Sequence, residues 1–165
     1  LDPARRPGEQ VFGVPVLGDD GWLAGRDPAA LLLANGAGQV PRADVRERLF
    51  EGFRARGFGF VSVRHPSAVV GGEALPAEGS QVMAGAAVQC RARIGRNAVV
   101  NTRASVDHDC VVGDHAFVGP GATLCGEVRV GDGAGILVDL IQHLPRVDVK
   151  LVDDVVGQEA SEAWG

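Results

Sequence analysis

A spacing of six residues between aliphatic side chains runs from Val70 to Ile136 of this 165-residue chain and constrains its fold more than any other feature. The residues at this spacing are aliphatic with one exception: Val70, Pro76, Val82, Val88, Ile94, Val100, Val106, Val112, Val118, Leu124, Val130 and Ile136. The residue four places further on is small in nearly every unit: Ala74, Ser80, Ala86, Ala92, Ala98, Ala104, Cys110, Ala116, Ala122, Val128, Ala134 and Leu140. Because both rows keep their character over so many units, both are expected to point into one interior.

This hexapeptide pattern predicts a left-handed parallel β-helix, in which three hexapeptides form each triangular coil. The aliphatic residue fills the interior, and the small residue fits a tight corner. Glycine often follows the aliphatic residue, as at Gly95, Gly113 and Gly131, and is expected to ease the turn. With a strand spacing of roughly 4.8 Å, the four coils would give a prism ~19 Å tall.

The residues before the repeat predict a strand, a helix and a strand between Ala29 and Val63. The apolar run Ala30–Ala34 is expected to be a buried strand, and the turn Asn35–Gly38 follows it. A second strand is expected at Gly59–Val63, joined to the first by a right-handed parallel crossover. Ligands favour the carboxyl ends of strands in such units, which makes Asn35 a candidate substrate-binding residue.

The helix between these strands is predicted from its apolar period. Val45, Leu49 and Phe53 recur at intervals of four residues, a spacing typical of a helix. Asp44 begins a segment that resembles a capping box, and Gly57 stands just past the expected end.

The sequence divides into three parts. Residues 1–66 are expected to form a small, N-terminally truncated α/β (Rossmann-like) domain, and residues 67–141 the β-helix. His65 is expected to fix the joint between the two domains. The repeat fails after Ile136, so residues 142–165 are expected to be an irregular tail or a cap over the open end of the helix. Met83 is the only methionine, so Leu1 is not an ordinary start and a fragment is expected.

The composition narrows the classes of partner. The formal net charge is -5 and no Lys/Arg-rich run is present, which argues against nucleic acid and anionic membranes as partners. No apolar stretch reaches the roughly 20 residues that a membrane-spanning helix needs. Three cysteines in no CxxC or Cys/His cluster make a poor disulfide framework, so a reduced, cytoplasmic protein is expected.

His108 is an ionisable side chain at an outward position of the repeat, and it is the first candidate for catalysis. It lies between Asp107 and Asp109, at an outward place of its hexapeptide, with Cys90 one coil earlier and Gly126 one coil later. A carboxylate partner would select the imidazole tautomer and support proton removal from an amine or hydroxyl. With no side chain at Gly126, the space above the ring is expected to be vacant, and its N–H is expected to meet an acyl oxygen. The alternative is a surface histidine bonded to neighbouring turns.

The other histidines and cysteines are weaker candidates for a catalytic or metal-binding role. His115 is expected to be an exposed turn residue, and His143 has no assignable role. Two outward histidines do not supply the three convergent ligands of a zinc site, so no metal is expected. Cys110 occupies a small interior place and is expected to belong to the core.

Four segments of the chain carry a family resemblance: Gly13–Gly18, His65–Ala68, Gln81–Thr102 and Ser105–Cys110. Together they resemble the bacterial sugar O-acyltransferases of the sialic acid O-acetyltransferase group. This group includes the nucleotide 4-amino-sugar N-acetyltransferases of the bacillosamine and perosamine pathways of surface polysaccharide biosynthesis. The resemblance covers roughly residues 2 to 136.

The resemblance implies a homotrimer with active sites between adjacent prisms, acetyl-CoA as co-substrate and a nucleotide sugar held by residues 1–66. His108 matches the general base and Asp109 its carboxylate partner. Gly126 matches the N–H donor to the acetyl carbonyl, Asn101 a polar residue near the acceptor group, and Asp2 an acid that contacts the nucleotide base.

Three departures from the family stand out. The family usually opens with a strand and a glycine-rich loop that binds the nucleotide. This sequence does not contain them, which affects the prediction of nucleotide binding. A histidine that is frequent nine residues after the catalytic one is Phe117 here, and the hexapeptides stop near Ile136, which bears on the donor site.

The leading hypothesis is therefore acetyl transfer from acetyl-CoA to the 4-amino group of a nucleotide-linked sugar, by direct attack on the thioester. Two alternatives stay open: a sugar O-acetyltransferase of the sialic acid type, and a degenerate trimeric scaffold that has lost donor binding. A γ-type carbonic anhydrase fails for want of three histidines.

Overall fold

The computed structural model describes residues 1–38 and 44–136 of the chain. Leu140, His143 and the expected tail or cap at 142–165 lie outside the described residues. The N-terminal region contains β1 (Gln10–Val11), β2 (Val14–Pro15), β3 (Leu32–Leu33), α1 (Val45–Ala55), β4 (Gly59–Phe60) and two short 3-10 helices, η1 (Asp20–Leu23) and η2 (Pro28–Ala30). No helix among the described residues has the length and apolar character needed to cross a bilayer.

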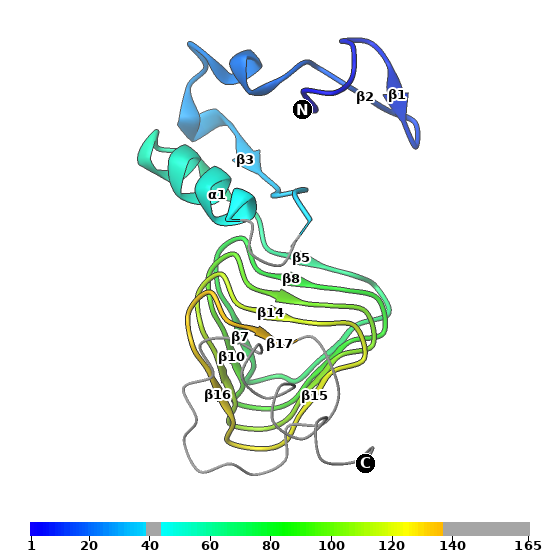
Figure 1. The fold of residues 1–165 in the computed structure, drawn as a ribbon, viewed down its shortest axis with the longest axis vertical. Coiled ribbons are helices and arrows are strands. Elements are labelled where there is room, and N and C mark those ends of the chain that lie inside the picture. Colours follow the sequence, from blue (N-terminus) through cyan, green and yellow to red (C-terminus); the bar gives the residue numbers. More distant parts are fainter. Residues whose placement is uncertain (39–43, 137–165) are drawn as a thin grey trace, which may run out of the picture.

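The remaining strands wind into a parallel β-helix, whose coils appear as stacked triangles in Figure 1. Its strands are β5 (Val63–Arg64), β6 (Val69–Val70), β7 (Leu75–Pro76), β8 (Gln81–Val82), β9 (Ala87–Val88), β10 (Arg93–Ile94), β11 (Val99–Val100), β12 (Ser105–Val106), β13 (Val111–Val112), β14 (Phe117–Val118), β15 (Thr123–Leu124), β16 (Arg129–Val130) and β17 (Gly135–Ile136). Strands three apart pair in parallel, so each residue lies beside the residue eighteen places along, as Val106 lies beside Leu124.

Three flat faces result, and each is named here by its first strand. The β5 face has the order β17-β14-β11-β8-β5, the β6 face the order β15-β12-β9-β6, and the β7 face the order β16-β13-β10-β7. The hexapeptide prediction of a parallel β-helix is therefore confirmed, with one strand from each unit.

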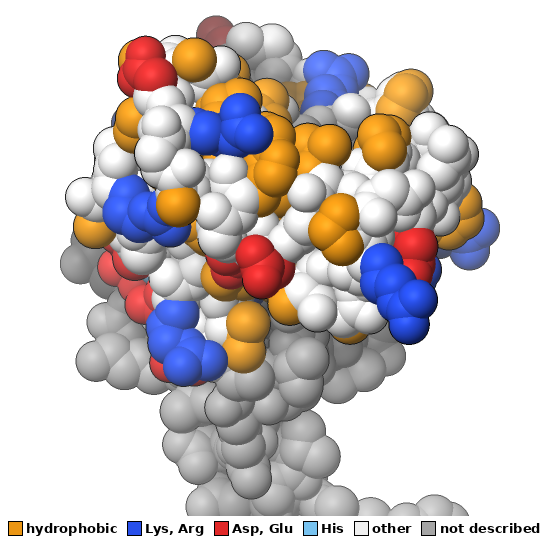
Figure 2. Space-filling view, turned by 90° about the horizontal axis from the view of Figure 1, so that it is seen from above, with side chains coloured by type: hydrophobic (Ala, Val, Ile, Leu, Met, Phe, Trp, Pro, Cys, Tyr) orange, Lys and Arg blue, Asp and Glu red, His pale blue; other side chains and the backbone are white. Residues whose placement is uncertain are grey.

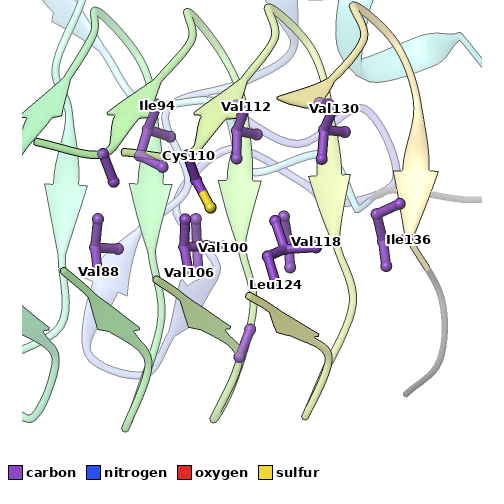
Figure 3. Packing of buried hydrophobic residues seen from close by; sticks show 14 of the residues in the cluster. Val88, Ile94, Val100, Val106, Cys110, Val112, Val118, Leu124, Val130 and Ile136 are labelled. Atoms are coloured by element: carbon purple, nitrogen blue, oxygen red, sulfur yellow. The ribbon is translucent and has the colours of Figure 1, made fainter. Parts of the chain in front are cut away.

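The interior holds the two rows that the repeat predicts. Val88, Ile94, Val100 and their equivalents in later coils are at most 3% exposed, and Figure 3 shows these side chains pointing inward in rows. The small residues beside them, such as Ala98 and Ala116, are fully buried. Apolar burial of this kind is the main stabilising contribution to the prism.

The turns between strands use a left-handed backbone with the period of the repeat. Positive φ angles between 54° and 74° occur at every sixth residue: Gly79, Gly85, Arg91, Asn97, Arg103, Asp109, His115, Gly121, Glu127 and Gly133. These are the fourth places of the hexapeptides, two places after Gly95 and Gly113, which lie outside the left-handed region. The expectation that those two glycines ease the turn is therefore wrong.

Gly95 and Gly113 are required by close approach between coils instead. A Cβ on Gly95 would lie 2.5 Å from the backbone nitrogen of Asp114 and the carbonyl carbon of Gly113. A Cβ on Gly113 would lie 2.6 Å from the backbone nitrogen of Asp132. Adjacent coils can keep their spacing here only because neither residue has a side chain.

The β-helix begins one hexapeptide before Val70. Val63 and Arg64 of β5 pair with Gln81 and Val82, so the pairing starts four residues before the expected boundary at residue 67. Arg64 occupies the register of the aliphatic row but is exposed, and its guanidinium donates to the Ala68 carbonyl oxygen at 3.2 Å. A charged residue at the open end needs no interior place, which is why the aliphatic pattern misses this unit.

The expected strand, helix and strand are present in the N-terminal region, but the strands are short. Leu32 and Leu33 of β3 pair in parallel with Gly59 and Phe60 of β4, and this pair forms a sheet of only two strands. Leu32 is 71% exposed, so the expectation of a fully buried first strand is wrong. Figure 2 looks down on this end of the molecule and shows hydrophobic side chains at the surface between arginines and carboxylates.

Helix α1 forms where the apolar period predicts it, and its most buried residues lie beside that apolar row. Phe50 is fully buried and Arg46 is 3% exposed, whereas Val45 is 43% exposed. Asp44 makes no side-chain capping bond and pairs instead with Arg48, Oδ1 to Nε, at 3.0 Å. The capping-box expectation is therefore wrong, because the carboxylate turns along the helix surface.

Candidate active site

His108 stands at the corner between the β6 face and the β7 face, in the turn from β12 to β13. Val106 and Cys110, two residues before and two residues after His108, point into the core and are fully buried. The turn therefore directs the imidazole outward, where the side chain is 48% exposed. Oδ1 of Asp107 accepts the backbone N–H of His108 at 2.7 Å and fixes the entry to the turn.

Gly126 lies one coil further along the same corner, directly against the His108 ring. A Cβ added to Gly126 would fall 2.6 Å from both Nε2 and Cε1 of His108. The space that the sequence predicted to be vacant is thus filled by the imidazole itself, and any larger residue would push the ring away. Among the described residues the Gly126 N–H donates no backbone hydrogen bond, so it stays available as a donor.

Asp109 holds the other side of the ring. Its Oδ2 lies 2.9 Å from Nδ1 of His108. A carboxylate only accepts, so Nδ1 carries the proton in the neutral ring and Nε2 keeps its lone pair. The backbone of Asp109 is left-handed, with φ of 59°, a conformation that aspartate tolerates better than most residues.

Arg91, one coil before Asp109, donates two hydrogen bonds to the same carboxylate. Its Nε donates to Oδ1 and its Nη2 donates to Oδ2, both at 2.6 Å. These bonds from Arg91, followed by the bond from His108, hold the pKa of the Asp109 carboxyl well below its usual range. Asp109 is therefore charged at every pH at which His108 can act as a base.

Asn101 lies at a different corner, in the turn from β11 to β12 between the β5 and β6 faces. Its Oδ1 accepts the backbone N–H of Thr102 at 2.7 Å, and no hydrogen bond joins it to His108. Phe117 is 8% exposed on the β5 face and also lies away from the His108 corner. One chain therefore does not bring Asn101 and His108 together.

Asn35 is built into the joint between the N-terminal region and the β-helix. It is 6% exposed, and its Nδ2 donates to the Arg46 carbonyl oxygen at 2.9 Å and to Oδ1 of Asn97 at 3.1 Å. Its carbonyl oxygen accepts from Gln81 at 2.7 Å. These bonds pack the Asn35 amide between α1 and the β-helix, and its role in substrate binding stays a prediction.

The guanidinium of Arg46 is buried in the same joint, and its bonding partners among the described residues are backbone carbonyl oxygens. Its Nη1 donates to the carbonyl oxygens of Asn35 and Ala37 at 2.9 and 3.0 Å, and its Nε to that of Asn97 at 3.3 Å. Burial lowers its pKa to about 10. These bonds tie the chain after β3 to α1 and to the corner between the β7 and β5 faces.

Two histidines exchange the roles expected from the sequence. His115 is not an exposed turn residue, because its side chain is 12% exposed and stacks edge-on against Phe50 with ring centroids 5.6 Å apart. Its Nε2 lies 3.2 Å from Oε1 of Glu51, which ties α1 to the β-helix. His65 is exposed and bonds locally to Ser67, Nδ1 to Oγ at 2.8 Å, so the expectation that it fixes the joint is wrong.

The remaining predicted residues have local partners. Asp2 accepts the Ala4 backbone N–H at 2.9 Å and pairs with Arg5 at 3.2 Å. Cys110 is fully buried as predicted, and Cys90 is exposed below His108 in its corner. Within residues 1–38 and 44–136, no cluster of three His, Cys, Asp or Glu side chains is placed to hold a metal ion.

Arg91 is the site residue that the sequence interpretation missed. The signal was present, because Arg91 stands eighteen residues before Asp109, and eighteen residues is one coil of the predicted helix. Opposite charges at that spacing are vertical neighbours in a parallel β-helix. The fourth places of this corner hold Glu73, Arg91, Asp109 and Glu127 in succession.

Comparison with known proteins gives three informative structural neighbours. Perosamine N-acetyltransferase from Caulobacter crescentus, a histidine-to-asparagine variant in complex with CoA and GDP-perosamine, is 37% identical, with a TM-score of 0.66. The match covers 81% of this chain and 63% of that one. A histidine-to-alanine variant of GDP-perosamine N-acetyltransferase from the same organism, also with CoA and GDP-perosamine, is 33% identical over 81% of this chain and 74% of that one, with a TM-score of 0.55.

The third neighbour is the acetyltransferase domain of PglB from Neisseria gonorrhoeae FA1090. It is 28% identical, the match covers 86% of this chain and 77% of that one, and the TM-score is 0.67. No protein-family model and no curated sequence matches the chain.

The likeness in fold confirms the left-handed parallel β-helix that the hexapeptides predicted. The identity to the two structures of perosamine N-acetyltransferase, carried over most of this chain, confirms the family that its motifs resemble. The chain belongs to the hexapeptide-repeat sugar acetyltransferases.

Proposed function

We propose that this chain is an acetyl-CoA-dependent acetyltransferase that acts on the 4-amino group of a nucleotide-linked amino-sugar, with His108 as general base. The observation that carries the proposal is the placement of the imidazole, with Nδ1 on Asp109 at 2.9 Å and Nε2 against Gly126. Structural neighbours crystallised with CoA and GDP-perosamine support this class of donor and acceptor.

The chemistry follows from what each residue offers. Nε2 of His108 takes a proton from the amine as its nitrogen attacks the thioester carbonyl carbon. The carbon–sulfur bond breaks, the electron pair leaves with the sulfur of CoA, and the imidazolium of His108 gives its proton to that sulfur. Asp109 stabilises the imidazolium formed at His108. The N–H of Gly126 donates to the oxygen on which negative charge develops. No covalent enzyme intermediate is needed.

A cytoplasmic homotrimer is part of the proposal. Helix α1 contacts the corner between the β7 and β5 faces through His115, whereas His108 stands at the corner between the β6 and β7 faces. A nucleotide sugar held by residues 1–66 of one protomer would therefore meet His108 of another. The three cysteines are free in the described residues, in keeping with a reducing compartment.

Acetyl-CoA, incubated with GDP-perosamine and other nucleotide 4-amino-sugars while free thiol is followed, tests this function. Release of CoA thiol that depends on the amino-sugar is expected, and His108→Ala should reduce it by about 10²–10⁴-fold. Acetylation of a sialic acid hydroxyl instead would establish the O-acetyltransferase. Failure to bind acetyl-CoA would establish the scaffold, and undiminished turnover in His108→Ala would remove the proposed base.

A further inference from the structure

The carboxylate that supports His108 is shared with a second, stronger partner. Both oxygens of Asp109 accept from Arg91 at 2.6 Å, and Oδ2 alone also faces His108 at 2.9 Å. A planar guanidinium that binds two oxygens side by side fixes the plane of the carboxylate, which one bond from an imidazole does not.

We propose that Arg91 is a positioning residue of the acetyl-transfer site, whose two bonds to Asp109 orient Oδ2 toward Nδ1 of His108. The inference rests on the proposed function and deepens it. With Oδ2 fixed as an acceptor, the neutral ring carries its proton on Nδ1. The lone pair then stays on Nε2, the nitrogen that lies against Gly126.

The geometry of the coil explains why Arg91 reaches Asp109. Both residues take the fourth place of their hexapeptides with a left-handed backbone, φ of 60° and 59°, so their side chains leave the corner in the same direction. Their coils are adjacent in register, since Val88 of β9 pairs with Val106 of β12. Glu73 lies one coil below Arg91 and attracts it electrostatically, but Arg91 donates its two hydrogen bonds to Asp109.

The charge of Arg91 has a second effect on the site. The acidic residues at the His108 corner are Glu73, Asp107, Asp109 and Glu127, and the thiols are those of Cys90 and Cys125. Arg91 supplies the positive charge among these groups. By neutralising Asp109, Arg91 limits how strongly that carboxylate stabilises a protonated imidazole. Removal of Arg91 would therefore leave the His108 ring beside an uncompensated carboxylate.

Three substitutions separate positioning from simple stability. Arg91→Met removes the charge and both bonds, whereas Arg91→Lys keeps a point charge without the fork. Arg103→Met is the matched control, because Arg103 is exposed, has the same place in its hexapeptide and has φ of 57°, but stands at another corner. Exposed ion pairs contribute little to stability, so all three variants should fold, as circular dichroism will verify.

The first measurement is the ¹⁵N spectrum of the His108 ring at a pH where it is neutral, which reports the tautomer without any substrate. The Nδ1–H form should dominate in the wild-type protein and in Arg103→Met, and should lose its dominance in Arg91→Met. The same Nδ1–H population in all variants would overturn the inference, even with a lower melting temperature in Arg91→Met.

The second measurement is the pH profile of acetyl transfer. In Arg91→Met the acid limb of kcat/KM should move to higher pH, because the uncompensated carboxylate of Asp109 favours the protonated imidazole. The value of kcat should fall roughly 10-fold with KM for acetyl-CoA unchanged. Arg91→Lys should keep the acid limb of the wild type and have an intermediate kcat. A wild-type protein with no activity would contradict the proposed function, and the tautomer comparison would then decide the role of Arg91 alone.

Discussion

The imidazole of His108 occupies the place where a side chain on Gly126 would begin, 2.6 Å from the position of the absent Cβ. The two residues stand eighteen apart, one above the other in adjacent coils. The glycine therefore has two functions at the same point, since it leaves room for the ring and presents an unobstructed N–H beside it.

Gly126→Ala should displace the ring of His108 and reduce acetyl transfer by roughly 10²-fold, as expected when a reacting group moves by about 1 Å. Stability should change by less than about 0.5 kcal/mol, because the half-exposed imidazole is free to swing outward. Steady-state kinetics and urea unfolding measure the two effects.

Gly72→Ala provides the control for this substitution. Gly72 has the same place in the repeat, at the same corner, and a Cβ there would meet no atom within 4 Å. Its kinetics should match the wild type. Equal activity in Gly126→Ala and Gly72→Ala would contradict the contact between the ring and Gly126.

Asp109→Asn should lower kcat by roughly 10- to 100-fold, part of the about 10²–10⁴-fold that a general base contributes. The amide group does not stabilise the imidazolium as a carboxylate does. Because Arg91 keeps the pKa of Asp109 well below its usual range, protonation of Asp109 does not produce the acid limb of the wild-type profile. That limb should move to lower pH in Asp109→Asn, since the base has lost an anionic neighbour.

Asp107→Asn separates charge from orientation in the same corner. It also removes one negative charge, but its amide oxygen can still accept the backbone N–H of His108, which Asp107 binds at 2.7 Å. Its kcat should stay within a few-fold of the wild type. A loss of kcat as large as that of Asp109→Asn would assign the effect to net charge and remove the special role of Asp109.

The period of the repeat predicts the fold because every aliphatic residue in it must be buried. An aliphatic side chain every sixth residue can be buried only if every sixth residue turns inward, and the triangular coil meets this demand from Val82 to Ile136. The N-terminal region has no such repetition. The buried face of α1 is set by Phe50 and Arg46, and two of their partners, His115 and Asn97, lie far away in sequence.

The same distinction explains which site residues could be found. His108, Asp109 and Gly126 are neighbours in sequence or stand one coil apart, so the register places them together. The place of Asn35 after a strand predicts a ligand residue, but its bonds to Asn97 and Gln81 depend on how two parts of the chain pack and cannot be predicted from that place. A turn residue at the end of a strand looks the same in sequence whether it binds substrate or another segment.

Gly95→Ala tests the close approach between coils. Its Cβ would lie 2.5 Å from backbone atoms of Gly113 and Asp114, which are held by the pairing of β10 with β13. The variant should lose about 3 kcal/mol of unfolding free energy or more, because overpacked backbone has nowhere to move. Gly52→Ala in α1 is the control: its Cβ would meet nothing within 4 Å, and it should gain about 0.5–1 kcal/mol. Similar unfolding curves for the two variants would contradict the different origins of these glycines.

Asn35→Ala and Asn101→Ala distinguish a packing residue from a substrate-binding one. Asn35 is 6% exposed and its amide bonds bridge Arg46 and Asn97, so its loss should cost about 1–3 kcal/mol by leaving buried partners unsatisfied. KM for the nucleotide sugar should then be unchanged in protein that remains folded. Asn101 bonds only locally to Thr102 among the described residues, so Asn101→Ala should cost little stability. If it lies near the acceptor in a neighbouring protomer, as the family resemblance implies, KM for the sugar should rise several-fold. A rise in KM for Asn35→Ala without loss of stability would restore Asn35 as a substrate-binding residue.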